Sequence, residues 1–320
     1  MTSTTVSERT DAATPVSVAR APRKRSLWWR NWQLYSLLVL PVIWFVVFRY
    51  VPMAGNIIAF RNYTPGGNIF GEGWVGLDNF TMFLSDPSFW QVFRNTIVLG
   101  GLTLVFGFPI PLVLALLLNE VRHRGFKRFV QTTTYLPHFL SIVIVAGMIM
   151  QLTSATGSIN QLLSTMGMHK IEFLQDPAWF PAIYVVSEIW QTAGWGTILY
   201  LAALTTIDES LYEAARIDGA GRLKQIWHVT LPGIRPTIIT LLILNIGSFM
   251  TVGFEKILLL YNPAIYDTAD VISTYLYRVG LQSGSFSYAA AIGIFEAVIG
   301  LVLVVSANFI SRRLIGASLW

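Results

Sequence analysis

The stretch from Asn95 to Asn119, which is mostly apolar and holds no charged side chain, constrains the fold of this chain most. A helix that crosses a lipid bilayer needs about 20 mostly apolar residues, and this stretch is long enough to supply them. Soluble domains carry about 25% charged residues. Only 12% of these 320 residues are charged and 54% are hydrophobic, so much of the protein surface must meet lipid.

Six stretches of the chain are apolar and long enough to cross a membrane. We expect transmembrane helices at roughly 33–52, 94–119, 131–151, 180–206, 237–260 and 287–311. The predicted fold class is therefore an all-α membrane protein with six transmembrane helices.

The basic residues predict how these helices are oriented. Most of the 22 Lys and Arg residues fall at 9–30, 122–128, 216–235 and 312–313, and in a six-span chain these four regions all lie on one side of the membrane. Positive charge marks cytoplasmic loops. We therefore expect both termini in the cytoplasm, and the basic clusters require no nucleic-acid partner.

The N-terminal residues differ in composition from the remainder. Residues 1–26 are rich in Ser, Thr, Ala and Arg, which is typical of a disordered tail, and no apolar segment of a signal peptide follows the first charges. Trp28, Trp29 and Trp32 precede the first span, where indole rings anchor a helix at the headgroup level. We expect a basic cytoplasmic tail and anchor at 1–32 and a transmembrane domain at 33–320.

Several catalytic and metal-binding motifs are missing from the sequence. The chain has no cysteine, none of its lysines precedes Ser or Thr as in a Walker A loop, and its four histidines are too dispersed for a zinc helix. No Gly-x-Ser-x-Gly elbow occurs. We therefore expect no metal site, no catalytic residue and no enzyme activity in this chain.

A polar segment at about 207–236 lies between the fourth and fifth predicted spans. Asp208 or Ser210 is suited to cap a short helix, Gly219 permits a tight turn, and a second helix would run over about 223–229 until Pro232 ends it or turns it back. These residues predict a helix–turn–helix unit on the cytoplasmic face. An amphipathic loop resting on lipid headgroups is the alternative.

This segment also carries a recognisable pattern. The order Glu213-Ala214-Ala215, Asp218-Gly219-Ala220 and Leu231-Pro232 resembles the EAA loop of permease subunits of bacterial ATP-binding-cassette importers, in the carbohydrate-uptake branch. The stretches 117–122 and 131–139 are similar to permeases for oligosaccharides, often fragments of plant or algal polysaccharides. The resemblance covers roughly residues 33–320 and implies a type I importer permease in the bacterial cytoplasmic membrane.

The resemblance implies a mechanical role for the segment at 207–236, which would dock as a coupling helix in a groove of a separate ATPase. Glu213 would pair with a basic residue of the ATPase, Ala214 and Ala215 would fill the groove, and Gly219 would make the turn. The coupling set is Glu213, Ala214, Ala215, Asp218, Gly219, Ala220, Leu231 and Pro232.

The implied partners are a second, homologous permease, two copies of the cytoplasmic ATPase, an extracytoplasmic solute-binding protein and membrane lipid. This chain would hold no cofactor, because ATP and Mg would be bound by the ATPase.

Polar residues at membrane depth predict a substrate pathway. A charged side chain there costs about 2.5–3.5 kcal/mol on insertion scales, so it persists where it faces a cavity or a partner. Aromatic faces stack on sugar rings, and amides and carboxylates bind hydroxyls. The candidates are Glu188, Trp190, Gln191, Trp195, Tyr200, Asn245, Ser248, Glu255 and Glu296.

A structural interpretation of these residues also stands. Glu188 or Glu296 would then satisfy a neighbouring helix, and His138 would be a structural polar residue. Glu255 and Lys256 are adjacent, so on one helix they point about 100° apart and need not pair.

The sequence favours the permease subunit of an ATP-driven sugar or oligosaccharide importer. A proton-coupled secondary carrier using the intramembrane acids is one alternative, although a carrier needs no docking loop. An ATP-binding-cassette permease for a non-sugar solute is the other.

Overall fold

A computed structural model describes residues 32–315 of the chain, and the side chains as far as Arg313. The predicted tail, including the anchors Trp28 and Trp29, lies outside the described residues. The chain divides into two compact units between Ala54 and Gly55. In the first unit, α2 (Trp32–Phe45) continues through a π-helical turn (Val46–Tyr50) into α3 (Val51–Ala54). The predicted boundary at residue 32 stays a prediction.

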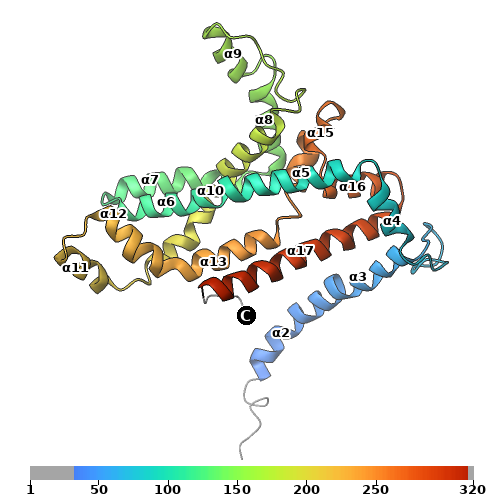
Figure 1. The fold of residues 1–320 in the computed structure, drawn as a ribbon, viewed down its shortest axis with the longest axis horizontal. Helices are drawn as coiled ribbons and strands as arrows, with labels where there is room; N and C mark the ends of the chain where they lie inside the picture. Colours follow the sequence, from blue (N-terminus) through green and yellow to red (C-terminus); the bar gives the residue numbers. More distant parts are fainter. Residues whose placement is uncertain (1–31, 316–320) are drawn as a thin grey trace, which may run out of the picture. The chain divides into compact units, whose positions relative to one another are not determined.

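The second unit begins at Gly55 with the 3-10 helix Gly55–Phe60, and its described part consists of helices joined by loops, as Figure 1 shows. No strand occurs among residues 32–315; there is one isolated bridge, between Arg61 and Trp74. The helices of its first half are α4 (Asp78–Ser85), α5 (Phe89–Leu102), α6 (Pro109–Glu120), α7 (Arg124–Tyr135), α8 (Ile142–Thr153), α9 (Ser158–Thr165) and α10 (Phe180–Leu204). Those of its second half are α11 (Glu209–Ile217), α12 (Arg222–Gln225), α13 (Leu231–Gly247), α14 (Phe254–Leu260), α15 (Tyr266–Ala269), α16 (Ile272–Tyr277) and α17 (Phe286–Ile315).

Within the described residues, five helical stretches are long and apolar enough to cross a membrane: Trp32–Phe60, Phe89–Glu120, Ile142–Thr165, Arg222–Gly247 and Phe286–Arg313. The helix α10 is not one of them. Its 25 residues would span about 37 Å, but it carries Glu188, Gln191 and several small or hydroxyl side chains. The predicted all-α membrane class is confirmed, and the count of six spans stays a prediction.

The third predicted span, 131–151, is wrong in its bounds. Residues 131–135 belong to α7, a 3-10 turn covers Leu136–Phe139, and α8 begins only at Ile142. Pro137 lies in the first turn of the 3-10 segment and has no N–H to donate. Ser141 is extended, with ψ at 139°, so the chain starts a new helix there.

The fifth predicted span, 237–260, is not one helix. The helix α13 ends at Gly247, and α14 starts after Gly253, which adopts the left-handed conformation with φ at +44°. Glu255 and Lys256 therefore lie on a separate short helix. Non-helical backbone at membrane depth is tolerated where protein buries it or where it lines a cavity.

Pro232 does not end the helix that begins in the 207–236 segment, so the first of the two predicted outcomes at Pro232 is wrong. The helix runs without interruption over Arg222–Gly247 because a π turn at Ile226–Thr230 shifts the hydrogen bonding, so that the Leu231 N–H donates to the Ile226 carbonyl. Pro232 follows this turn at the start of α13, where its fixed φ fits a helix.

The core of the second unit joins its long helices directly. The helix α10 packs against α6, α7 and α13, and α13 also packs against α17. Buried Ala115 of α6, Tyr200 and Leu204 of α10 and Ile234 of α13 form one apolar cluster. This packing ties the cytoplasmic segment, which connects α10 to α13, to the centre of the bundle.

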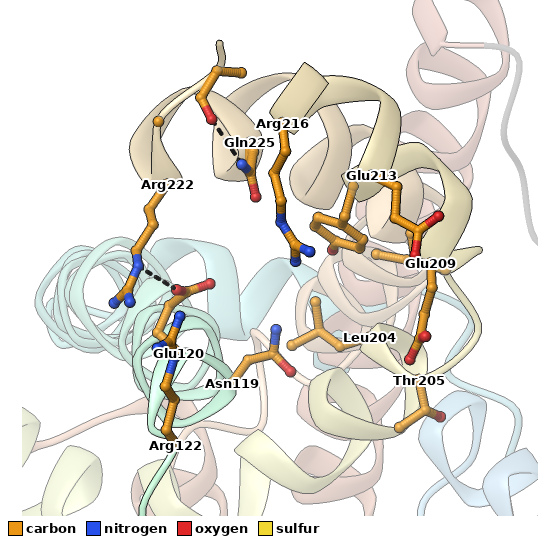
Figure 2. A pocket seen from close by; sticks show the side chains of 14 residues that line it. Asn119, Glu120, Arg122, Leu204, Thr205, Glu209, Glu213, Arg216, Arg222 and Gln225 are labelled. Carbon is orange, nitrogen blue, oxygen red and sulfur yellow. Dashed lines mark hydrogen bonds and ion pairs between the residues drawn. The ribbon is translucent and has the colours of Figure 1, made fainter. Parts of the chain in front are cut away.

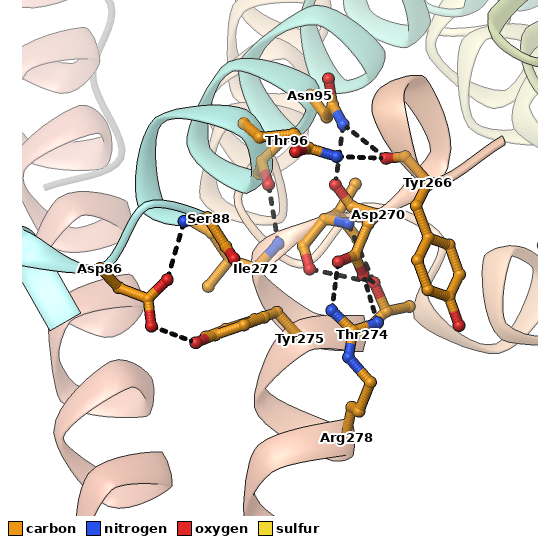
Figure 3. A network of polar contacts seen from close by, with 12 residues as sticks. Asp86, Ser88, Asn95, Thr96, Tyr266, Asp270, Ile272, Thr274, Tyr275 and Arg278 are labelled. Carbon is orange, nitrogen blue, oxygen red and sulfur yellow. Dashed lines mark hydrogen bonds and ion pairs between the residues drawn. The ribbon is translucent and has the colours of Figure 1, made fainter. Parts of the chain in front are cut away.

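A polar network joins α5 to α16 and α17, as Figure 3 shows in part. The Tyr275 hydroxyl donates to Asp86 Oδ2 at 2.8 Å, and Tyr288 donates to the same oxygen at 3.2 Å. Asp270, which is buried, pairs with Arg278 at 2.5 Å and accepts from the Thr274 hydroxyl. Asp86, Asp270 and Arg278 each have a hydrogen-bond or ion-pair partner within this network. The network therefore stabilises the fold.

Candidate functional site

The helix α11 of the 207–236 segment is capped at both ends. The Asp208 carboxylate accepts the Ser210 N–H at 2.9 Å, and this hydrogen bond holds the pKa of Asp208 below its ordinary value of 3.8. At the other end Gly219 has φ at +75°, its N–H donates to the Arg216 carbonyl, and the Ala220 N–H donates to the Ala215 carbonyl at 2.8 Å. This pair of bonds is a Schellman motif. The predicted cap and turn are confirmed.

A cleft of about 910 Å³ lies between this segment and the end of α6 (Figure 2). Three carboxylates and three guanidinium groups share its lining: Glu120, Glu209, Glu213, Arg122, Arg216 and Arg222. Arg222 Nε lies 3.9 Å from Glu120 Oε2, and both side chains are more than a third exposed. Such a pair contributes about 0–1 kcal/mol. The cleft wall formed by α12 is therefore weakly held to α6.

The predicted coupling residues share one property: they are accessible. Glu213, Ala214, Asp218, Gly219 and Pro232 are exposed, and Ala215, Ala220 and Leu231 are half-buried. Small side chains and a tight turn at a surface leave room for another backbone to approach. Their coupling role stays a prediction.

The polar residues of α10 line a second cavity, deeper in the bundle. Glu188, Thr192, Trp195 and Leu199 recur at helical spacing, so they occupy one face of α10. They line a lobe of about 300 Å³ together with His138 of the 3-10 turn, Tyr200 of α10 and Asn245 of α13. An adjoining lobe of about 240 Å³ shares Glu188 and Asn245 and adds Ser248 and Thr251 from the break between α13 and α14.

Glu188 is engaged by a cation from another helix. Lys256 Nζ of α14 lies 2.5 Å from Glu188 Oε2; the lysine side chain is 1% exposed and the glutamate 26%. The lysine also lies 5.9 Å from the centre of the Tyr184 ring. The carboxylate thus stands at the cavity surface and the ammonium group behind it, in the wall.

The structure brings together five of the nine predicted pathway residues: Glu188, Trp195, Tyr200, Asn245 and Ser248. The other four lie elsewhere. Trp190 and Glu255 are exposed and Gln191 is buried, and none of these three lines either lobe. Glu296 is buried, accepts the Ser273 hydroxyl at 3.0 Å and lines a separate hollow between α13 and α17. Their contact with substrate stays untested.

Two cavity residues were missed by reasoning from the sequence. His138 stacks on Trp195 with ring centres 4.5 Å apart and planes within 6°. Thr103, in the π turn that joins α5 to α6, lines both lobes, and its buried hydroxyl has no hydrogen-bond partner in the described chain. A π turn inside a long helix often marks a functional position, but the sequence carries no signal for it.

The chain has membrane-length helices, a capped helix–turn–helix unit and a polar cavity within the bundle, which are features of the membrane-spanning subunit of a transporter. Residues 107–316 match the family described as binding-protein-dependent transport system inner membrane component, and the chain belongs to this family. It is a non-catalytic, multi-pass subunit of the inner (cytoplasmic) membrane, and ATP hydrolysis belongs to a separate subunit. The predicted identification as an importer permease is confirmed.

Relatives of known name match nearly the whole chain. Protein LplB of Bacillus subtilis (strain 168) is 46% identical over 294 residues, 92% of this chain and 91% of that protein. The polygalacturonan/rhamnogalacturonan transport system permease protein YteP of the same strain is 48% identical over 281 residues, 88% of each chain.

Solved structures agree with this assignment. A bacterial ABC transporter involved in the import of the acidic polysaccharide alginate contains a chain that is 47% identical, with a TM-score of 0.83 over 90% of this chain and 98% of that chain. A bacterial alginate ABC transporter in complex with an alginate-pentasaccharide-bound periplasmic protein contains a chain that is 46% identical. There the TM-score is 0.85 over 93% of this chain and 100% of that chain.

Proposed function

We propose that this chain is the permease subunit of an ATP-driven importer of acidic oligosaccharides. The observation that carries the proposal is the match, over almost the whole length of both chains, to a transporter of the acidic polysaccharide alginate. The YteP name supports the same substrate class, since polygalacturonan is also built from uronic acids. An extracytoplasmic solute-binding protein would deliver the sugar, as the periplasmic protein carries alginate in the related complex.

The remaining partners are part of the same proposal. A second, homologous permease would complete the pathway, and two copies of a cytoplasmic ATPase would bind ATP and Mg. This chain would itself hold no cofactor. The helix–turn–helix unit from Glu209 to Thr230 would dock in the ATPase groove, with Glu213 toward a basic residue there and Ala214 and Ala215 against its wall.

The continuous helix from Arg222 to Gly247 supports a mechanical coupling of the cleft beside α12 to the cavity around Glu188. Its first turns border the cytoplasmic cleft, and Asn245 near its end lines the inner cavity. A helix of 26 residues spans about 39 Å. Because the π turn keeps the helix unbroken at Pro232, a displacement of α12 by the ATPase would move Asn245 without a loop to absorb it.

Co-purification with the ATPase tests the coupling role. Gly219→Pro cannot adopt φ at +75°, and Glu213→Ala removes the exposed carboxylate. Both variants should reach the membrane at wild-type levels but recover several-fold less ATPase. Gly221→Ala is the matched control, because Gly221 has an ordinary φ of −67° and no atom within 4 Å of an added Cβ.

Transport tests the substrate class. The complete transporter in proteoliposomes should take up a uronate oligosaccharide only with ATP and the solute-binding protein. Uptake that follows a proton gradient without ATP would establish the carrier alternative. ATP-driven uptake of another solute, without uptake of uronates, would establish a different cargo.

For the co-purification experiment, recovery of the ATPase at the wild-type level in both coupling variants would contradict the proposed docking role.

A further inference from the structure

The charge of the inner cavity bears on how an acidic substrate could pass, and this inference rests on the proposed function. Among the described residues, Glu188 is the only carboxylate that lines either lobe. An anionic sugar beside an uncompensated carboxylate would be repelled, because like charges placed together are strongly unfavourable where water is scarce. A cavity for uronates therefore needs this charge to be neutralised.

Lys256 supplies that neutralisation from inside the wall. Its Nζ lies 2.5 Å from Glu188 Oε2 while the side chain is almost fully buried, so the cation cannot itself be reached from the cavity. It reaches Glu188 because the chain breaks at residues 248–253 and restarts as α14, packed against α8 and α16. The pair leaves the cavity wall without net charge at this point.

The rest of the lining suits a sugar ring. The exposed face of Trp195, backed by His138 in a near-parallel stack, offers a flat apolar wall. Asn245 offers its amide oxygen, because its Nδ2 donates to the Leu241 carbonyl at 2.8 Å. A flat wall with a few placed polar groups is typical of small-molecule sites.

We propose that this cavity is a subsite for one uronate ring of the substrate, and that Lys256 sets its charge preference by neutralising Glu188. The ring would lie on the Trp195–His138 stack and donate one of its hydroxyls to the Asn245 amide oxygen. Lys256 is a positioning residue, since it acts on the sugar through Glu188.

The test uses the complete transporter in proteoliposomes, with one concentration of wild-type solute-binding protein for every variant. Lys256→Gln leaves Glu188 unpaired and should raise the apparent KM for a galacturonate trisaccharide by about tenfold or more. Glu188→Gln removes the anion that faces the substrate and should lower that KM. The double variant Glu188→Gln/Lys256→Gln should return the KM to within about threefold of wild type, and the exposed Lys170→Gln should not change it.

Opposite effects of the two single variants are the decisive readout. A merely structural ion pair would impair both variants alike, because each leaves one partner uncompensated. Raising the salt from 50 to 500 mM should also shrink the Lys256→Gln defect, since the repulsion is screened. If both single variants raise the KM equally, or if the Lys256→Gln defect is indifferent to salt, the proposal is overturned.

Assembly is checked in each variant by the thermal midpoint of the purified complex and its yield. Should Lys256→Gln fail to assemble, Glu188→Gln and the double variant still decide the question, because a structural pair predicts a raised KM for Glu188→Gln. Absence of uronate uptake by the wild-type transporter would instead overturn the proposed function, so the two failures are distinguishable.

Discussion

Gly253 occupies a position that no other residue type fits. Its φ of +44° lies in the left-handed region, and a Cβ there would stand 2.0 Å from the Tyr184 hydroxyl oxygen. Tyr184 is itself buried, so the ring has little room to withdraw. This one residue permits the chain to leave α13, turn, and enter α14 with Lys256 directed at Glu188.

Substitution of Gly253 should therefore destabilise the protein through two effects. In Gly253→Ala, the left-handed backbone conformation would cost about 1–2 kcal/mol. The clash of the added Cβ with Tyr184 would cost about 1–3 kcal/mol more, as is usual for overpacked side chains. Gly284→Ala is the matched control, because Gly284 has φ at +73° but no atom within 4 Å of an added Cβ. In detergent, the melting temperature of Gly253→Ala should fall well below that of Gly284→Ala. Equal losses of melting temperature in the two variants would mean that the Tyr184 ring moves aside without a cost in stability.

Among the helices, the start of α5 is tied to α16 and α17 through Asp86. Burial alone would raise the pKa of Asp86, but hydrogen bonds from the Ser88 N–H and from Tyr275 and Tyr288 outweigh it and hold the pKa below 3.8. A carboxyl whose pKa is lowered by folding stabilises the protein above its unfolded pKa. That stabilisation is lost as the pH falls through the lower, folded value.

The pH dependence of unfolding tests this tie. Asp86→Asn should lower stability by about 1 kcal/mol at neutral pH, since it replaces charge-assisted hydrogen bonds by weaker ones. The gap in melting temperature between wild type and variant should be constant above about pH 5 and narrow as the pH falls below 4. A gap that is unchanged from pH 7 to pH 3 would show that Asp86 is not the titrating group.

Two predictions from the sequence about where helices end failed. Apolar content predicts one span at 237–260, because the residues of the break, 248–253, carry no charge and include Phe249, Met250 and Val252. Pro232 predicts that the helix ends or turns back there, and a π turn carries the helix past it. The break before α14 depends on the left-handed Gly253, which lies against Tyr184 of α10.

For the whole molecule, the distribution of Lys and Arg predicts the orientation in the membrane. The absence of cysteine from the sequence makes this directly testable, since a single introduced thiol has no competitor. Ser210 lies in the first turn of α11, and Ser164 lies near the end of α9; both are exposed.

A membrane-impermeant maleimide should label Ser164→Cys in intact cells. It should label Ser210→Cys only after the membrane is opened, because the positively charged loops face the cytoplasm. The cysteine-free parent is the control for background. Labelling of Ser210→Cys in intact cells would reverse the predicted orientation and remove the segment from the reach of a cytoplasmic ATPase.

The sequence by itself determined the all-helical membrane class, the positions of three of the six predicted spans (33–52, 94–119 and 287–311), and the capped α11 with its turn at Gly219. These depend on apolar length, helical spacing and turn chemistry, which are local properties of the chain. Only the tertiary structure decided that Glu188 pairs with Lys256 and that His138 stacks on Trp195. Those contacts join residues far apart in sequence, and they depend on where a helix breaks and what it packs against, which no local pattern encodes.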